Sequence, residues 1–342
     1  MKKNILFING IPDSDTLWVQ KTHPNGEILS YKYRGLLSDL LSHLNPPDWN
    51  KLPALLDARE FPFRFDPATH CIINEITEAD THVKTLDYLG KLLKQNPEVP
   101  VFNPPEQVKL TRRDRVYEAL KDIPGLSVPK TIRFQPRHLN DILDCMAAND
   151  MQYPLILRSA GRHAGVGTLR FDNREQLNEG LYPMALDGSS YYLIQFHDTS
   201  QNGVFNKFRF ATVAGTPYPS HLRYDAHWMV HYYSGKRFMA KHPEYFENEK
   251  TFLADYTAMM PAHFEAVMEA IYQRIPIDYT GLDFTLHPET GEILLFELNP
   301  NMLILGIDPP YEPHDVKSSQ AIQDAIVALA TSRMNAAFSL SG

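Results

Sequence analysis

The stretch that most constrains the fold of this chain covers residues 281–301 and reads GLDFTLHPETGEILLFELNPN. Apolar and other residues alternate on both sides of a central Pro-Glu-Thr-Gly segment, which is the pattern of two half-buried strands joined by a tight turn. A three-residue loop at 289–291 lets Gly291 adopt the left-handed conformation and pairs Asp283 with Glu297. We therefore expect a β-hairpin with two acidic residues opposite each other.

Two carboxylates on opposed strands lie roughly 5 Å apart and repel each other unless a positive group lies between them. A divalent cation would meet that need, and period-two alternation places Asn299 on the same face as Glu297. Asp283, Glu297 and Asn299 form an oxygen-only set that suits Mg²⁺ with bound phosphate and water. The alternative is an exposed hairpin with scattered acidic residues, and a two-residue loop would turn Asp283 to the other face.

The composition of the chain is that of an ordinary globular protein. Its 342 residues, 43% hydrophobic and 22% charged, suffice for two or three domains. A net charge of −8 argues against a broad nucleic-acid surface, because phosphate binding needs clustered Lys and Arg. Cys71 and Cys145 lack metal-ligand spacing, the apolar run Ile5–Ile8 is too short for a signal peptide, and no apolar segment approaches membrane-spanning length. We therefore expect a cytoplasmic protein with no nucleic-acid or membrane partner.

The N-terminal part of the chain has the pattern of a small α/β unit. Strands are expected at 4–8, 70–76 and 101–102, while the proline- and aromatic-rich region 46–67 is expected to form a loop with short helices. No glycine-rich dinucleotide fingerprint is present, which argues against a Rossmann dehydrogenase. A linker at 103–105 follows, and apolar spacing then predicts helices at 111–121, 137–149, 249–275 and 316–330, the third divided at Pro261.

A glycine-rich segment follows the second of these helices and reads YPLILRSAGRHAGVG. It predicts a short buried strand that leads into Arg158 and then a loop with three glycines. Such glycines let backbone amides approach an anion, and Arg158, Arg162 and His163 can add positive charge. The alternative is a flexible surface turn with solvated arginines.

Basic side chains share faces on two later strands. Period two places Lys207 with Arg209 on one strand, and His221 with Arg223 on the next. Three histidines fall between positions 221 and 231, which could suggest zinc, but the spacing does not guarantee convergent ligands and no cysteine assists. Histidines that face solvent or a substrate are the favoured interpretation.

Taken in order, these segments resemble the ATP-grasp superfamily, in which ATP lies between a central lid domain and a C-terminal domain. GLDF and FELNPN are similar to the family's metal-binding strands, PLILRSAGRHAGVG to its phosphate loop, LIQFHD to the hinge that holds adenine, and NKFRF to a strand whose arginine contacts the γ-phosphate. The resemblance covers roughly residues 103–340. LRSAGRHAGVG, the HLRY to HWMVHYY segment and LLFELNPNM resemble more closely an ATP-grasp group sometimes fused to tetratricopeptide repeats, although no 34-residue helical repeat is present.

The resemblance implies an α/β fold with an α+β lid and three domains, at residues 1–105, 106–197 and 198–342. It implies ATP and one or two Mg²⁺ ions as cofactors, with Asp283, Glu297 and Asn299 as metal ligands. Two arginines stand where the family usually has phosphate-binding lysines, and either Gln195 or His197 stands where the hinge usually has a glutamate. The residues implied to bind ATP are Arg115, Arg158, Gly161, His163, Gly165, Gly167, Gln195, Phe196, His197 and Lys207.

The implied activity is ATP-dependent ligation of a carboxylate to an amine through an acylphosphate, on a small molecule or a peptide. Arg158, Arg209, His221 and Arg223 are the predicted catalytic residues, and His227, His231 and Asn301 are predicted to bind the substrate. A small-molecule kinase on the same fold and a nucleotide-binding regulator without turnover are the alternatives. A homodimer is compatible with this prediction.

Overall fold

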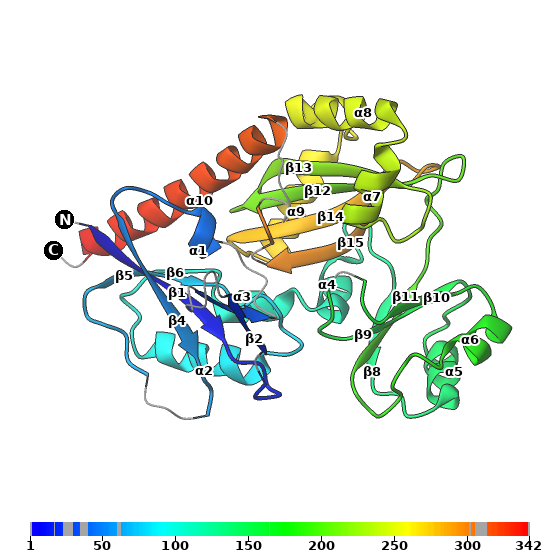
Figure 1. The fold of residues 1–342 in the computed structure, drawn as a ribbon, viewed down its shortest axis with the longest axis horizontal. Helices are drawn as coiled ribbons and strands as arrows, with labels where there is room; N and C mark the ends of the chain where they lie inside the picture. Colours follow the sequence, from blue (N-terminus) through cyan, green and yellow to red (C-terminus); the bar gives the residue numbers. More distant parts are fainter. Residues whose placement is uncertain are drawn as a thin grey trace.

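The computed structural model describes residues 2–16, 18–22, 30–34, 40–59, 63–163, 165–300, 302–304 and 313–340. Three β-sheets with flanking helices make up most of this part, together with a two-stranded ribbon of β2 (Trp18–Thr22) and β3 (Ser30–Arg34). Figure 1 shows an N-terminal sheet and a lid sheet side by side below a C-terminal sheet. The predicted α/β fold class is thereby confirmed. No helix in the described ranges has the length and apolar character needed to cross a membrane.

The N-terminal sheet is parallel, with strand order β4-β1-β5-β6. It consists of β1 (Lys3–Gly10), β4 (Trp49–Leu56), β5 (Thr69–Asn74) and β6 (Val101–Phe102), accompanied by α1 (Leu40–His43) and α2 (Val83–Lys94). The presence of β4 corrects the expectation that residues 46–67 form a loop with short helices. Pro53 is tolerated in this strand because β4 lies at the edge of the sheet, where a missing N–H donor costs no ladder bond.

The lid sheet is antiparallel, with strand order β10-β9-β11-β8. Its strands are β8 (Thr131–Phe134), β9 (Leu155–Ser159), β10 (Thr168–Phe171) and β11 (Tyr191–Gln195), and its helices are α5 (Leu139–Ala148) and α6 (Arg174–Gly180). Apolar residues of the strands and helices form a core cluster that belongs to the lid alone. The lid is therefore an α+β unit with its own core.

The C-terminal sheet has strand order β13-β12-β14-β15-β7, with β7 parallel to β15 and the other pairs antiparallel. The strands are β7 (Leu126–Ser127), β12 (Phe205–Val213), β13 (Thr216–Asp225), β14 (Tyr279–Leu286) and β15 (Ile293–Pro300). The helices are α7 (Tyr232–Met239), α8 (Pro243–Ala254), α9 (Phe264–Arg274) and α10 (Pro313–Leu340). The helix expected at 249–275 is thus divided into α8, a 3₁₀ turn at Tyr256–Ala258 and α9, with Pro261 in the gap.

Two helices before β7, α3 (Pro105–Leu110) and α4 (Arg113–Leu120), were expected to belong to the central domain. Val116, Leu120 and Leu126 are instead buried in the same apolar cluster as Phe208 and Phe284 of the C-terminal sheet. The segment from α4 to β7 therefore packs with the C-terminal sheet, whereas α3 contacts α2, and the lid sheet begins at β8.

The hairpin of β14 and β15 has the predicted register, in which Asp283 pairs with Glu297, but it reaches this register by a different route. The ladder next to the turn leaves a loop of four residues, 288–291, rather than three. A β-bulge at Phe296 then adds one residue to β15 and restores the expected pairing. Gly291 has a φ of +70°, the left-handed conformation expected of it.

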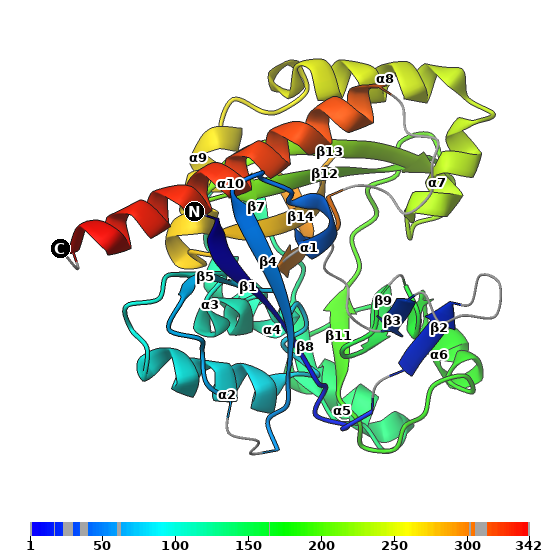
Figure 2. The same ribbon diagram turned by 60° about the vertical axis from the view of Figure 1, so that its left-hand side comes forward.

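The N-terminal and C-terminal sheets are joined by buried polar contacts at α10. Arg333 on this helix forms a bidentate ion pair with Asp278, which is 1% exposed and directly precedes β14. The Asn103 backbone N–H donates to the same carboxylate at 2.7 Å. Figure 2 shows α10 crossing from the C-terminal sheet toward the N-terminal sheet. These contacts connect the N-terminal part of the chain to the C-terminal sheet through Asp278 and α10.

Candidate active site

A cavity of about 400 Å³ lies between the lid sheet, the C-terminal sheet and the segment 228–233 that follows β13. Its walls combine apolar and aromatic side chains with a band of charged ones, a composition typical of small-molecule sites. The cavity brings together thirteen of the predicted site residues, which are Arg158, His163, Gly165, Gln195, Phe196, His197, Lys207, Arg209, His221, His231, Asp283, Glu297 and Asn299.

Asp283 lies at the centre of the charged band. Strand pairing places Arg209 of β12 opposite it, and the guanidinium binds both carboxylate oxygens, with Nε–Oδ1 and Nη2–Oδ2 distances of 2.5 and 2.6 Å. Lys207 Nζ lies 2.9 Å from Oδ2. Burial raises the pKa of this carboxyl, but Arg209 and Lys207 outweigh that effect and lower the pKa far below its ordinary range. Asp283 is therefore ionised throughout the physiological pH range.

Glu297 has separate cationic partners. Arg113, at the start of α4, places Nη2 2.9 Å from Glu297 Oε2 and donates through Nη1 to the Phe296 carbonyl at 3.0 Å. Burial opposes ionisation of Glu297, but Arg113 and Arg158 lower its pKa to about 2. Burial and the nearby charge of Arg113 in turn lower the pKa of Arg158 to about 10. Asp283 and Glu297 are thus both ionised, and each is paired with cationic side chains inside the cavity.

Arg113 was not among the predicted residues, and Arg115 was predicted in its place. Arg115 is exposed and is not among the residues that line the cavity. Residues two apart on a helix point about 200° apart, so a helix that turns Arg113 toward Glu297 turns Arg115 to solvent. A prediction that placed the start of α4 at Arg113 could have selected the correct arginine.

The hairpin residues suit a divalent cation by their chemistry. Asp283 and Glu297 face each other, both are deprotonated, and Asn299 lines the same cavity. Within the described part of the chain, no group of three or more His, Cys, Asp or Glu could hold a metal ion. Two carboxylates and one amide would therefore need further oxygen ligands from phosphate or water.

The glycine-rich loop after β9 packs closely on its surroundings. Gly161 and Gly165 have φ values of +68° and +73°, and a Cβ at these positions would lie 2.3 Å from Thr81 Cγ2 and 2.7 Å from Met229 Sδ. Gly167, with φ of +66°, accepts a hydrogen bond from the Ser159 N–H at 2.9 Å. The backbone of this loop thus lies against both the N-terminal part and the segment after β13, which only residues without a side chain permit.

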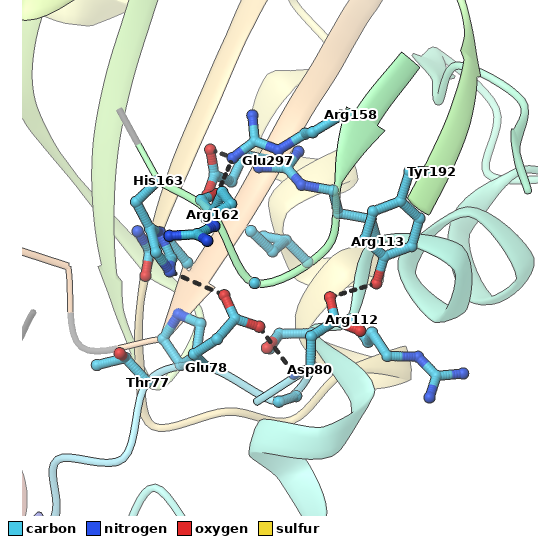
Figure 3. A pocket seen from close by; sticks show the side chains of 16 residues that line it. Thr77, Glu78, Asp80, Arg112, Arg113, Arg158, Arg162, His163, Tyr192 and Glu297 are labelled. Carbon is cyan, nitrogen blue, oxygen red and sulfur yellow. Dashed lines mark hydrogen bonds and ion pairs between the residues drawn. The ribbon is translucent and has the colours of Figure 1, made fainter. Parts of the chain in front are cut away.

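Figure 3 shows a smaller pocket where the loop after β5 meets the lid. Glu78 Oε2 lies 2.9 Å from His163 Nε2 of the glycine-rich loop. Asp80 accepts hydrogen bonds from Arg133 Nε at 3.0 Å and from the Tyr192 hydroxyl at 2.5 Å, and burial raises the pKa of Asp80. Sequence reasoning missed these acids, although acidic residues in the loop after a buried parallel strand are a recognisable signal of a ligand-binding edge.

The three predicted hinge residues all line the cavity, with different environments. Gln195 Nε2 donates to the Gln152 carbonyl at 2.8 Å and to the Pro154 carbonyl at 3.1 Å. The Phe196 ring stacks edge-on against Trp228 at 5.8 Å. Burial lowers the pKa of His197. A flat aromatic ligand beside these three residues would therefore contact apolar groups and would have polar atoms of the backbone and of His197 nearby.

His221 and His231 line the cavity beyond the charged band. Burial, with the charges of Arg209 and Arg223, holds the pKa of His221 well below its ordinary value. Burial, with Lys207 and Arg209, also lowers the pKa of His231. Both imidazoles are therefore uncharged near neutral pH, and the lowered pKa makes each a weak proton acceptor.

Four other predicted residues are not among those that line the cavity, namely Gly161 and Gly167 of the glycine-rich loop, Arg223 and His227. Arg223 is 4% exposed and forms an ion pair with Glu249 of α8, because α7 and α8 cover this part of β13. His227 belongs to a turn in which its N–H donates to Asp225 at 3.1 Å and its Nδ1 accepts from the Met229 N–H at 3.2 Å. The predicted roles of Arg223 and His227 in direct contact with substrate are therefore corrected. Asn301 lies outside the described residues.

No family model and no curated protein sequence matches this chain. Solved structures do match it in fold. The VanG D-Ala:D-Ser ligase from Enterococcus faecalis has a TM-score of 0.55 at 12% identity, covering 96% of this chain and 100% of that chain. A D-alanine–D-alanine ligase from Bacillus anthracis complexed with ATP has a TM-score of 0.54 at 11% identity, covering 100% of both chains.

A third similar structure is the RimK domain protein ATP-grasp from Sphaerobacter thermophilus, with a TM-score of 0.50 at 13% identity over 95% of this chain and 99% of that one. Because these likenesses extend over almost the whole of each chain, the protein has the fold of the ATP-grasp ligases. Identities this low concern the fold alone.

Proposed function

We propose that this protein is an ATP- and Mg²⁺-dependent ligase that joins a carboxylate to an amine through an acylphosphate. The observation that carries the proposal is the pairing of Asp283 with Glu297 in a cavity that also contains four cationic side chains. These cations, Arg113, Arg158, Lys207 and Arg209, exceed the two carboxylates and leave a positive balance that attracts a nucleoside triphosphate. The ligases that share this fold support the same chemistry. We also propose that, within the ATP-grasp superfamily, the protein is most similar to the domains sometimes fused to tetratricopeptide repeats.

Asp283, Glu297 and Asn299 would hold the Mg²⁺. When bound, the ion supplies positive charge where negative charge develops during phosphoryl transfer. Arg209 and Lys207, which now neutralise Asp283, would then turn to the phosphate and acyl oxygens. The ion pairs of the cavity thus hold the cations at the site until ligand oxygens replace the carboxylate.

The remaining residues have separable roles in the proposed reaction. Adenine lies at the hinge beside Phe196, and Arg158 with the glycine-rich loop binds the phosphates and excludes water. An acceptor carboxylate oxygen attacks the γ-phosphorus, and the bond to ADP breaks. Arg209 stabilises the transferred phosphoryl group and then the tetrahedral intermediate. An amine attacks the acyl carbon, the bond to phosphate breaks, and the proton that the amine loses leaves with the phosphate.

Replacement of the paired acids tests the metal assignment. Asp283→Asn and Glu297→Gln should each lower acceptor-dependent ADP release by about 10²-fold or more, because a single charged ligand holds the cation weakly. Glu289→Gln is a matched control, since Glu289 is an exposed acid in the turn of the same hairpin. Undiminished turnover in both variants would contradict the assignment.

The mass of the product separates the proposed ligase from a small-molecule kinase. A ligase gives two molecules joined with loss of water, whereas a kinase gives an acceptor that retains phosphate. A product with retained phosphate would contradict ligation. Binding of ATP with no ADP formed from any acceptor would instead support the nucleotide-binding regulator.

A further inference from the structure

A loop of the N-terminal part, residues 77–82 after β5, lies against the glycine-rich loop of the lid. Glu78 Oε2 lies 2.9 Å from His163 Nε2, and Figure 3 shows the two side chains pointing toward each other. Thr81 Cγ2 fills the space beside Gly161, where a Cβ would lie only 2.3 Å away. One side-chain contact and one close backbone approach thus connect the two loops.

Both oxygens of the Glu78 carboxylate are engaged. Oε1 accepts a hydrogen bond from the Asp80 N–H at 2.8 Å, within the same loop, and Oε2 faces His163. Burial opposes ionisation of Glu78, but His163 and the Asp80 N–H outweigh it and lower the pKa below its ordinary value. Because an ionised carboxylate only accepts hydrogen bonds, His163 Nε2 carries a proton in this contact. Glu78 therefore fixes the orientation of the imidazole.

His163 lies where the smaller pocket meets the main cavity. It lines both, as do Arg158 and Glu297. The His163 carbonyl accepts a hydrogen bond from the Val166 N–H at 3.1 Å, which closes a turn that contains Gly165. Gly165 itself lines the main cavity. The position of His163 therefore constrains the part of the glycine-rich loop that borders the main cavity.

The size of the smaller pocket argues against direct contact between Glu78 and a substrate. Its volume is about 30 Å³, which leaves room for about one or two water molecules. Glu78 and Glu297, which both line it, are already paired with His163 and Arg113. Glu78 thus faces a side chain of the lid rather than an open binding space, and this favours a positioning role.

We propose that Glu78 is a positioning residue of the ATP site, which acts through His163 to hold the glycine-rich loop in place for the phosphates. This proposal rests on the proposed function, in which that loop binds the phosphates of ATP. None of the described residues that line the main cavity comes from the N-terminal part, residues 1–105. Glu78 gives that part a role in ATP binding, because a loop that is ordered beforehand loses less freedom when it binds.

A double-mutant cycle tests whether Glu78 acts through His163. The dissociation constant of adenylyl imidodiphosphate with Mg²⁺ is measured for the full chain, Glu78→Ala, His163→Asn and the double variant. Glu78→Ala should weaken binding about fivefold, because the loop is then less ordered before it binds. In the His163→Asn background the same change should have no further effect, since the contact is already absent. An equal loss in both backgrounds would mean that Glu78 acts independently of His163, and would overturn the proposal.

Two further variants control for charge and for loss of the side chain. Glu78→Gln keeps an acceptor for His163 Nε2 and should recover part of the affinity that Glu78→Ala loses. Asp80 is an acid of the same loop that contacts Arg133 and Tyr192 of the lid strands. Asp80→Asn can keep both contacts and should change the affinity less than about twofold. A loss in Asp80→Asn as large as that in Glu78→Ala would mean that negative charge on the loop, not the contact with His163, supports binding.

Amide hydrogen exchange separates failure of this inference from failure of the proposed function. Without nucleotide, Glu78→Ala should speed exchange of the Val166 amide, which donates to the His163 carbonyl, at least about threefold. The Leu157 amide in the centre of β9 is the control and should exchange as in wild type. Faster exchange at Val166, in a protein whose wild type does not bind the analogue, supports the contact and contradicts ATP dependence. Unchanged exchange with normal binding by wild type overturns the positioning role and leaves the ligase intact.

Discussion

The C-terminal sheet carries two buried ion pairs of the same chemistry that differ in what covers them. Arg209 binds Asp283 within the cavity. Arg223, on the neighbouring strand, binds Glu249 beneath α7 and α8, and these two residues are 4% and 2% exposed. The first pair can exchange its partner for a ligand, whereas the second has no access to one. A buried arginine on a strand can therefore contact a ligand only where no helix covers it. The spacing of residues along the strand does not predict whether a helix covers that position.

The largest expected effect concerns the covered pair. Arg223→Met should lower the free energy of unfolding by about 3 kcal/mol, because it leaves Glu249 buried without its partner. Urea unfolding measures the change. Glu249 also accepts a hydrogen bond from the Leu222 N–H at 3.1 Å, which a glutamine can retain. The double variant Arg223→Met with Glu249→Gln should therefore recover most of the loss, and a double variant as unstable as Arg223→Met would show that packing, not the charge, dominates.

The open pair should give the opposite profile. Arg209→Met should lower acceptor-dependent ADP release by about 10²–10³-fold, because it removes a cation from the position where negative charge develops. Its unfolding free energy should change less than that of Arg223→Met, since Asp283 keeps Lys207 as a partner. Steady-state kinetics per folded molecule checks this. If Arg223→Met loses as much activity per folded molecule as Arg209→Met, the distinction between the pairs fails.

Acid titration should separate an open carboxylate from the covered one. Arg113 and Arg158, acting against burial, lower the pKa of Glu297 from 4.5 to about 2, so its stabilising contribution is complete above pH 4.5 and is lost as the pH falls toward 2. This contribution is about 3 kcal/mol by linkage. Urea unfolding between pH 2 and 6 should show a shallower decline for Glu297→Gln than for wild type, with Glu289→Gln unchanged.

Glu249 should act in the other direction. Burial raises the pKa of Glu249 above 4.5 despite Arg223, so the folded protein favours the protonated form of this side chain. The stabilisation that this form contributes at low pH is lost as the pH rises through the raised pKa. Glu249→Gln should remove that decline. A parallel response of the Glu249→Gln and Glu297→Gln variants would contradict the opposite environments assigned to the two acids.

The hairpin shows how far a sequence pattern reaches. Alternation of apolar residues predicted both strands and the face of Asp283, because one face of each strand must be buried. The predicted loop of three residues was wrong, and the bulge at Phe296 was not foreseen, yet the two differences cancel in the register. A period-two pattern specifies which side chains share a face, but the bulge and turn that produce the register depend on tertiary contacts.

The errors in the candidate site have a common physical cause. Lys207, Arg209 and His221 could be predicted because strand periodicity places them on one face, and the cavity leaves that part of the face open. Arg223 has the same periodicity, and its burial depends on α7 and α8, which pack over it from later in the sequence. Sequence spacing defines the direction of a side chain, whereas access to a cavity depends on packing between distant segments.

The smallest expected effect tests the same idea on α4, where one arginine faces the cavity and the other faces solvent. Arg113→Ala should raise the KM for ATP about tenfold, because Arg113 neutralises Glu297 and borders the phosphate region. Arg115→Ala is the matched control on the same helix and should leave the KM unchanged, since Arg115 is exposed. Steady-state kinetics with ATP as the varied substrate measures both. An equal rise in KM for both variants would mean that the general positive charge near the cavity attracts ATP, rather than a contact from the inner face of α4. The two KM values would then also depend on salt concentration in the same way.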